Sequence, residues 1–231
     1  MPFVAEQIST GKRICTFDYK SADQIRNSFH KDDIQCPFCK SKMFPVTSCR
    51  DLFFWRHAAK SSSCPTAREG RESALHLMAK KKRFDALKAG SEAGRYTVEM
   101  EYRIPNAGKH GRIADIATIH ANGSIVAHEI QLSKISVEEL EERTSDYREQ
   151  GISSIWLFGE TALSTDVLKW NYLNFGGVYV IEFHGEASLT LSRVSLVLKT
   201  VNQAAIAAIN GRFTDPFRML NADKNMEGQE D

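Results

Sequence analysis

The stretch from Arg112 to Gln131 constrains the fold most, because it predicts two short strands joined at Asn122-Gly123. This dipeptide tolerates the positive φ that a tight hairpin turn needs. Side chains on a strand alternate between its two faces, so Glu129 and Gln131 share one face of the second strand. If the two strands pair, we expect Asp115 on the first strand to converge with Glu129 on one spot, with Gln131 beside them.

Two carboxylates on adjacent rigid strands are a ligand set that suits Mg²⁺ or Mn²⁺, because both ions are hard cations that prefer oxygen ligands. The same spacing is also typical of a simpler arrangement, a hairpin that carries scattered surface charges. Spacing alone does not separate the two interpretations.

A helix is predicted over residues 69–90, which have a helical composition and end at a glycine. Glu72, His76 and Lys80 are spaced four residues apart and therefore line one face of this helix. Taken by itself, such a triplet is more typical of a solvated stripe with a weak Glu–His pair. The run from Lys80 to Arg83 is the densest basic patch in the chain, and beside an acidic site it could hold phosphates.

Residues 36–64 contain candidate ligands for a soft metal ion. Cys36 and Cys39 form a C-x-x-C knuckle, whose short gap lets both thiolates reach one tetrahedral ion. His57 and Cys64 could complete the set, and Cys49 competes with them. A redox pair or incidental buried cysteines are the alternatives. We favour structural zinc, because a segment of roughly thirty residues cannot build a stable hydrophobic core without a metal ion or a disulfide to hold it together.

Composition limits the class of protein. The chain of 231 residues has 42% hydrophobic and 26% charged residues, which is ordinary for a globular protein. Its net charge of +1 creates no global basic field, so contacts with nucleic acid must come from local patches. No apolar run is long enough to span a bilayer, and no secretory signal is apparent. We therefore expect a cytoplasmic protein, in which the five cysteines bind metal or stay free.

The order of predicted elements from residue 66 onward is helix, three strands, helix, strand. The first strand covers residues 96–104, and a capping-box pattern at Ser136 begins a helix that runs to Gln150. This order predicts an α/β fold with a mixed sheet and helices on both faces. We expect a β-rich, zinc-ribbon-like module over residues 1–65, a nuclease-like domain over 66–220, and a disordered acidic tail over 221–231.

This arrangement resembles the PD-(D/E)xK nuclease superfamily, whose core is restriction-endonuclease-like, and within it the competence-protein CoiA-like nuclease family. The resemblance covers about residues 36–160 and depends on the order and spacing of several short segments. These are Cys36-Pro37-Phe38-Cys39, Phe54-Trp55-Arg56-His57, Glu72-Ser73 with His76, Val98-Glu99-Met100-Glu101, Arg112-Ile113-Ala114-Asp115, Glu129-Ile130-Gln131-Leu132-Ser133, Glu142-Arg143-Thr144 with Tyr147, and Trp156-Leu157-Phe158-Gly159.

The resemblance implies a Mg²⁺-type nuclease, with Mn²⁺ as the alternative ion. Asp115 and Glu129 would bind the ion, Glu72 could add a third carboxylate, and Gln131 would hold the attacking water. The residues that could contact a substrate phosphate are His76, Lys80, Arg143 and Tyr147. The zinc set implied for the N-terminal module is Cys36, Cys39, His57 and Cys64.

Two positions depart from the expected pattern, one from that of the superfamily and one from that of the family. The usual lysine after the acidic pair is Gln131 here, as it is in CoiA-like proteins, and a neutral amide can position water but contributes no positive charge. The first histidine of the family's His-Phe-Ala-His segment is Phe54 here, so it cannot be a ligand. The second corresponds to His57, which keeps the zinc assignment open.

The resulting hypothesis is a metal-dependent nuclease that hydrolyses phosphodiester bonds of DNA, in DNA uptake and recombination or in defence against foreign DNA. The main alternative is a nuclease fold that has lost its chemistry and only binds nucleic acid, and a further alternative is a zinc-stapled scaffold that binds protein. We expect DNA rather than RNA as partner, and no membrane. A homodimer would supply the two active sites that cutting a duplex often needs. The apolar segment near residues 194–209 could form the dimer interface or a closing helix.

Overall fold

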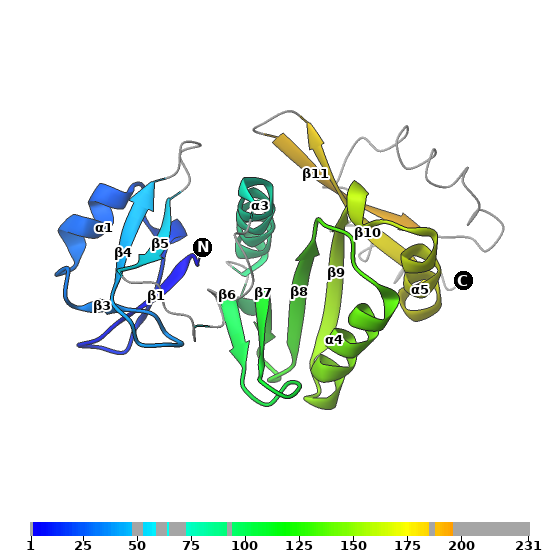
Figure 1. The fold of residues 1–231 in the computed structure, drawn as a ribbon, viewed down its shortest axis with the longest axis horizontal. Coiled ribbons are helices and arrows are strands. Elements are labelled where there is room, and N and C mark those ends of the chain that lie inside the picture. Colours follow the sequence, from blue (N-terminus) through cyan, green and yellow to red (C-terminus); the bar gives the residue numbers. More distant parts are fainter. Residues whose placement is uncertain are drawn as a thin grey trace, which may run out of the picture. The chain divides into compact units, whose positions relative to one another are not determined.

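The computed structural model describes residues 2–47, 53–58, 64, 73–91, 94–184 and 188–195. It divides into two compact units, Met1–His128 with Glu149–Ser153, and Glu129–Arg148 with Ser154–Asp231. Figure 1 shows the order of the elements along the chain. The domain boundaries predicted near residues 65 and 220 lie outside the described residues and stay predictions.

The first unit begins with small antiparallel sheets. Strands β1 (Val4–Gln7), β2 (Arg13–Cys15) and β3 (Ile34–Gln35) form a sheet in the order β2-β1-β3. Between β2 and β3 lie a 3-10 helix, η1 (Thr16–Asp18), and helix α1 (Ala22–Ser28). Strands β4 (Met43–Thr47) and β5 (Phe53–His57) then form the antiparallel ribbon of this module. Their core packs Ala5, Ile14, Ile25, Ile34, Cys36, Met43, Trp55 and Cys64 together.

The first unit continues with helix α3 (Ala74–Ser91) and the strands β6 (Tyr96–Ile104), β7 (Arg112–His120) and β8 (Ile125–Gln131). The pairs β6–β7 and β7–β8 are both antiparallel, so the three predicted strands form a meander. Gly123 has a φ of 82° between β7 and β8, which confirms the predicted hairpin turn. β8 passes from the first unit into the second after His128.

Helix α3 shares a core with both the N-terminal strands and the meander. Phe3 and Val4 pack together with Leu77 and Phe84 of α3 and with Met100 of β6. Figure 1 shows α3 beside β6 and β7. Phe3, which precedes β1, and Val4 of β1 therefore share one core with α3 and β6.

The second unit contains the helices α4 (Val137–Glu149) and α5 (Thr165–Phe175), the 3-10 helix η2 (Glu160–Ala162), and the strands β9 (Ser153–Gly159), β10 (Gly177–His184) and β11 (Ser188–Ser195). β9 and β10 pair in parallel, and β10 and β11 form an antiparallel hairpin. Both helices pack on β9 and β10 (Figure 1). The core that they enclose consists of Leu140, Trp156, Phe158, Ala162, Val167, Leu168, Trp170, Val178 and Val180.

Three predictions concern residues that the structure leaves undescribed. The acidic tail over 221–231 and the catalytic candidate Glu72 lie outside the described residues, and so does the apolar segment near 194–209 beyond Ser195. Within the described part of the chain, no helix has the length and apolar character needed to cross a membrane.

A buried polar cluster lies where α3 meets β7 and β8. Arg83 Nη2 lies 3.1 Å from His128 Nδ1, and Thr118 Oγ1 lies 3.4 Å from His128 Nε2. A guanidinium can only donate, so Nδ1 accepts and the ring proton sits on Nε2. Burial, together with the positive charge of Arg83 and the nearby His120, lowers the pKa of His128 to about 3.

This lowered pKa predicts a pH-dependent loss of stability. The unfolded chain binds a proton at His128 below its ordinary pKa of 6.5, whereas the folded protein does not until about pH 3. Stability from this residue is therefore present above pH 6.5 and falls by about 2 kcal/mol between pH 7 and pH 5. Urea unfolding at both pH values should show a smaller drop for His128→Gln than for the wild type. The exposed His110→Gln is the control, and equal drops in all three proteins would contradict the prediction.

Candidate functional site

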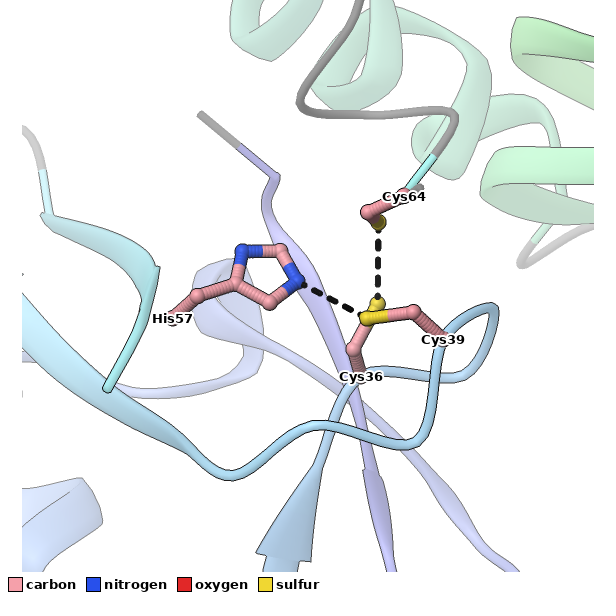
Figure 2. Close-up of side chains that lie close together, drawn as sticks. All are labelled: Cys36, Cys39, His57 and Cys64. Carbon is pink, nitrogen blue, oxygen red and sulfur yellow. Dashed lines mark hydrogen bonds between the residues drawn. The ribbon is translucent and has the colours of Figure 1, made fainter. Parts of the chain in front are cut away.

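The described residues contain a cluster of three cysteines and one histidine in the first unit. A tight turn follows Cys36, in which its carbonyl accepts from Lys40 N at 3.0 Å and its N–H donates to Ser41 O at 2.8 Å. This turn brings Cys39 back beside Cys36. His57 ends β5, and Cys64 follows it along the chain. Figure 2 shows the four side chains turned toward one another.

The geometry of this Cys₃His cluster fits a zinc ion. The four ligand atoms lie within 4.8 Å of one another. Cys36 Sγ lies 3.7 Å from Cys64 Sγ, and Cys39 Sγ lies 3.4 Å from His57 Nε2. A tetrahedral zinc ion, with Zn–S distances of about 2.3 Å and Zn–N distances of about 2.0 Å, separates two sulfurs by about 3.8 Å and sulfur from nitrogen by about 3.5 Å. The four predicted ligands therefore lie together and could hold a metal ion. Cys49 lies outside the described residues.

The thiols of this cluster differ in their readiness to ionise. Burial raises the pKa of Cys36 to about 12. Burial opposes ionisation of Cys39 as well, but hydrogen bonds from Ser41, Cys64 and Cys36 outweigh it and lower the pKa of Cys39 to about 6. Of these two thiols, Cys39 is thus the more ready to meet a cation as a thiolate, the form that binds metal.

We expect close to one zinc ion per chain in protein purified without chelator, measured by elemental analysis. Cys36→Ser should lose the zinc and lower the melting temperature, because metal binding contributes folding free energy in a small module. Cys15→Ser is the matched control, since Cys15 is a half-buried free cysteine of the same unit outside the cluster. Zinc-free wild-type protein, or a Cys36→Ser variant that keeps its zinc, would refute the assignment.

A second group of polar residues surrounds Asp115 in the first unit. His76 and Lys80 lie one turn apart on α3, and both reach Asp115, as their spacing on one helix face allows. His76 Nε2 lies 3.3 Å from Asp115 Oδ2, and Lys80 Nζ lies 3.3 Å from Asp115 Oδ1. The Lys80 side chain is only 3% exposed. A lysine this deeply buried is held by its acidic partners, and solvent does not compete for it.

Glu101 belongs to the same group and was missed by sequence reasoning. Its side chain is 4% exposed, and Lys80 Nζ lies 3.4 Å from its Oε1. Met100 pairs with Ile116 and Tyr102 pairs with Ala114, so Glu101 stands opposite Asp115 between these pairs. Its φ of 52° is rare for a residue with a side chain and costs about 1–3 kcal/mol. The sequence showed only an alternating strand, which carries no signal for this conformation or this burial.

A third group lies in the second unit around Glu129, whose side chain is 2% exposed. Tyr147 on α4 donates its hydroxyl to Glu129 Oε1 at 2.5 Å, and Arg143, one turn earlier, donates to Oε2. The Arg143 guanidinium also lies over the ring of Trp156, 4.8 Å from its centre. Gln131 donates its amide to Ser133 O at 2.8 Å.

These contacts show how the described residues among the predicted site residues are arranged. His76 and Lys80 gather at Asp115, and Arg143 and Tyr147 gather at Glu129. Each of the two carboxylates therefore has a cationic partner. A divalent ion at Glu129 would compete with the Arg143 guanidinium for Oε2.

Comparison with known proteins gives one family and one structural likeness. Residues 72–193 match the model of a family described as "Competence protein CoiA, nuclease-like domain". No curated protein matches the chain. A solved structure, a protein of unknown function from Silicibacter pomeroyi, is similar over 60% of this chain and 86% of its own, with 14% identity and a TM-score of 0.23.

Proposed function

Because the chain belongs to the family of the competence protein CoiA nuclease-like domain, we propose that it is a metal-dependent nuclease that hydrolyses phosphodiester bonds of DNA. The observation that carries the proposal is the span of the family match. It covers residues 72–193 and therefore includes all the candidate catalytic residues, Glu72, Asp115, Glu129 and Gln131. DNA uptake and recombination, or defence against foreign DNA, would be the setting of this activity.

In this proposal Asp115 and Glu129 hold Mg²⁺ or Mn²⁺, and Glu72 adds a carboxylate from the segment before α3. The bound ion would polarise the scissile phosphate and lower the pKa of its water. Gln131 would orient the attacking water through its side-chain amide, which must leave Ser133 to do so. Lys80 and His76 supply positive charge and hydrogen-bond donors beside Asp115, where a phosphate would approach.

Arg143 has a specific role in this proposal. Its side chain is 22% exposed, so it can leave Glu129 without crossing a packed core. A guanidinium binds phosphate in the same forked geometry as it binds carboxylate. Arg143 would therefore move from Glu129 to the substrate, which opens the carboxylate to the metal ion and retains the positive charge nearby. Tyr147 would stay on Glu129, since Tyr147 is fully buried.

A second candidate function is a nuclease fold that binds nucleic acid without cutting it. The ion pair between Arg143 and Glu129 favours this alternative, because it already neutralises a carboxylate that a metal ion would need. Gln131, which contributes no charge and is bonded to Ser133, favours it as well. Binding without cleavage at any Mg²⁺ concentration would identify this function.

The test is cleavage of plasmid, single-stranded DNA and RNA, with Mg²⁺ and with EDTA. We expect DNA to be cut only with the metal ion, and Asp115→Asn and Glu129→Gln to lower the rate at least about 100-fold, or ~2.7 kcal/mol of barrier. Asp85→Asn is the control, because Asp85 is an exposed acid on α3 that pairs with Lys81. Circular dichroism should show that all variants are folded. Cleavage by either site variant at the wild-type rate would rule out the proposed site.

A further inference from the structure

We propose that Glu101 is a positioning residue of this site, which fixes the Lys80 ammonium beside Asp115, and that the first strands of the chain hold Glu101 in place. This inference rests on the proposed function, because Asp115 is one of its metal ligands. Neither the family match nor the sequence pattern assigns a role to Glu101.

The conformation of Glu101 indicates that its placement is imposed by its surroundings. Its φ is 52° in the middle of a nine-residue strand, whereas the pairs on either side of it keep the regular register of β6 and β7. A side-chain-bearing residue avoids this region of φ unless other contacts hold it there. A charged group that is both buried and strained is therefore a candidate for a functional role.

The contacts around Lys80 suggest what that role is. The Lys80 ammonium lies 3.3 Å from Asp115 Oδ1 and 3.4 Å from Glu101 Oε1. The Lys80 ammonium is thus shared between two carboxylates, one of which is the proposed metal ligand Asp115. Because a second acid, Glu101, also holds this ammonium, it would keep its place when a metal ion binds Asp115. His76 borders the same group through Asp115 Oδ2.

Lys80 could also supply the positive charge that is missing at position 131, where the superfamily's usual lysine is replaced by Gln131. In phosphoryl transfer a preorganised cation stabilises the negative charge that develops on the phosphate. Lys80 is a buried cation beside a proposed metal ligand, so it can supply this charge from α3. The ammonium stabilises this charge effectively only if its position is fixed. Asp115 provides one contact that fixes it, and Glu101 provides the second.

Glu101 is itself held by the N-terminal strands. Glu101 Oε1 accepts from Phe3 N at 2.8 Å, and Oε2 accepts from Val4 N at 3.2 Å. Arg13 of β2 donates through Nη2 to Met100 O at 2.8 Å and to Glu101 O at 3.1 Å. Both carboxylate oxygens and the carbonyl of Glu101 are thus fixed by β1, β2 and the residue before β1. These strands would then contribute to catalysis by positioning Glu101, in addition to any contact that they make with the nucleic acid.

A double-mutant cycle on cleavage tests whether Glu101 acts through Lys80. We expect Glu101→Gln to lower kcat about 10- to 100-fold with KM for DNA changed less than threefold. Lys80→Met should lower kcat further than Glu101→Gln does. The double variant should be no slower than Lys80→Met, because Glu101 affects catalysis only by positioning the Lys80 ammonium. If the two losses multiply in the double variant, or if Glu101→Gln leaves kcat unchanged, the inference is wrong.

Matched variants separate positioning from general damage. Glu99→Gln removes a carboxylate from the same strand that lies 3.7 Å from Arg13 and is 38% exposed, and we expect kcat within twofold of wild type. Arg13→Met releases the Glu101 carbonyl through a side chain that is 35% exposed, so it should preserve the fold even if Glu101→Gln does not. We expect Arg13→Met to lower kcat in the wild type and to have no effect on kcat in the Lys80→Met background. Any further loss in that background would contradict the inference.

A second measurement does not depend on cleavage. Lysine acetylation, followed by peptide mass spectrometry, should modify Lys80 at least tenfold more slowly than Lys81, whose side chain is 40% exposed. In folded Glu101→Gln, or in folded Arg13→Met, Lys80 should react several-fold faster while Lys81 is unchanged. If the wild type proves inactive, the proposed function fails, but this labelling still decides whether Glu101 holds Lys80. Unchanged protection of Lys80 in both variants would refute the positioning role.

Discussion

A carboxylate taken out of water must find a cation or several hydrogen-bond donors, and this requirement explains the contacts of every buried acid described above. Asp115 and Glu101 share Lys80, and Glu101 also accepts from two backbone N–H groups. Glu129 is satisfied by Arg143 and Tyr147. The polar partners thus come from α3, α4 and the N-terminal strands, which determines how these elements meet the strands that carry the acids.

The same contacts account for the tension between a nuclease and an inactive binder. Cations beside acids stabilise the protein without ligand, and they also compete with a metal ion for the same oxygens. The competition is weakest where the cation can move to a phosphate, as the partial exposure of Arg143 allows. It is strongest where the cation is buried, as Lys80 is. A buried lysine is therefore better suited to remain in place and stabilise charge than to exchange with the metal ion.

Local patterns in the sequence predicted several features correctly. The Asn122-Gly123 turn, the helix that begins at Ser136 and the ribbon after the C-x-x-C knuckle all depend on residues close together in the chain. The grouping of Cys36, Cys39, His57 and Cys64 also agrees with the prediction, and knuckle geometry fixes two of these residues. That this cluster binds zinc stays a prediction. The family resemblance was confirmed by the match over residues 72–193. The roles of Asp115, Glu129 and Gln131 stay predictions, and Glu72 lies outside the described residues.

The sequence by itself determined the order of helices and strands, the placement of Asp115 and Glu129 on the two hairpin strands, and the Cys36–Cys39 knuckle. These features depend on the periodicity of hydrophobic residues, on turn residues and on short spacings, all of which act locally. Only the tertiary structure decided which cation meets which acid. Lys80 and Glu101 are 21 residues apart, and Phe3 and Glu101 are 98 apart. Contacts at such separations depend on strand register, on the positive φ of Glu101 and on how the N-terminal strands pack against α3. A single strand's alternation contains none of this information.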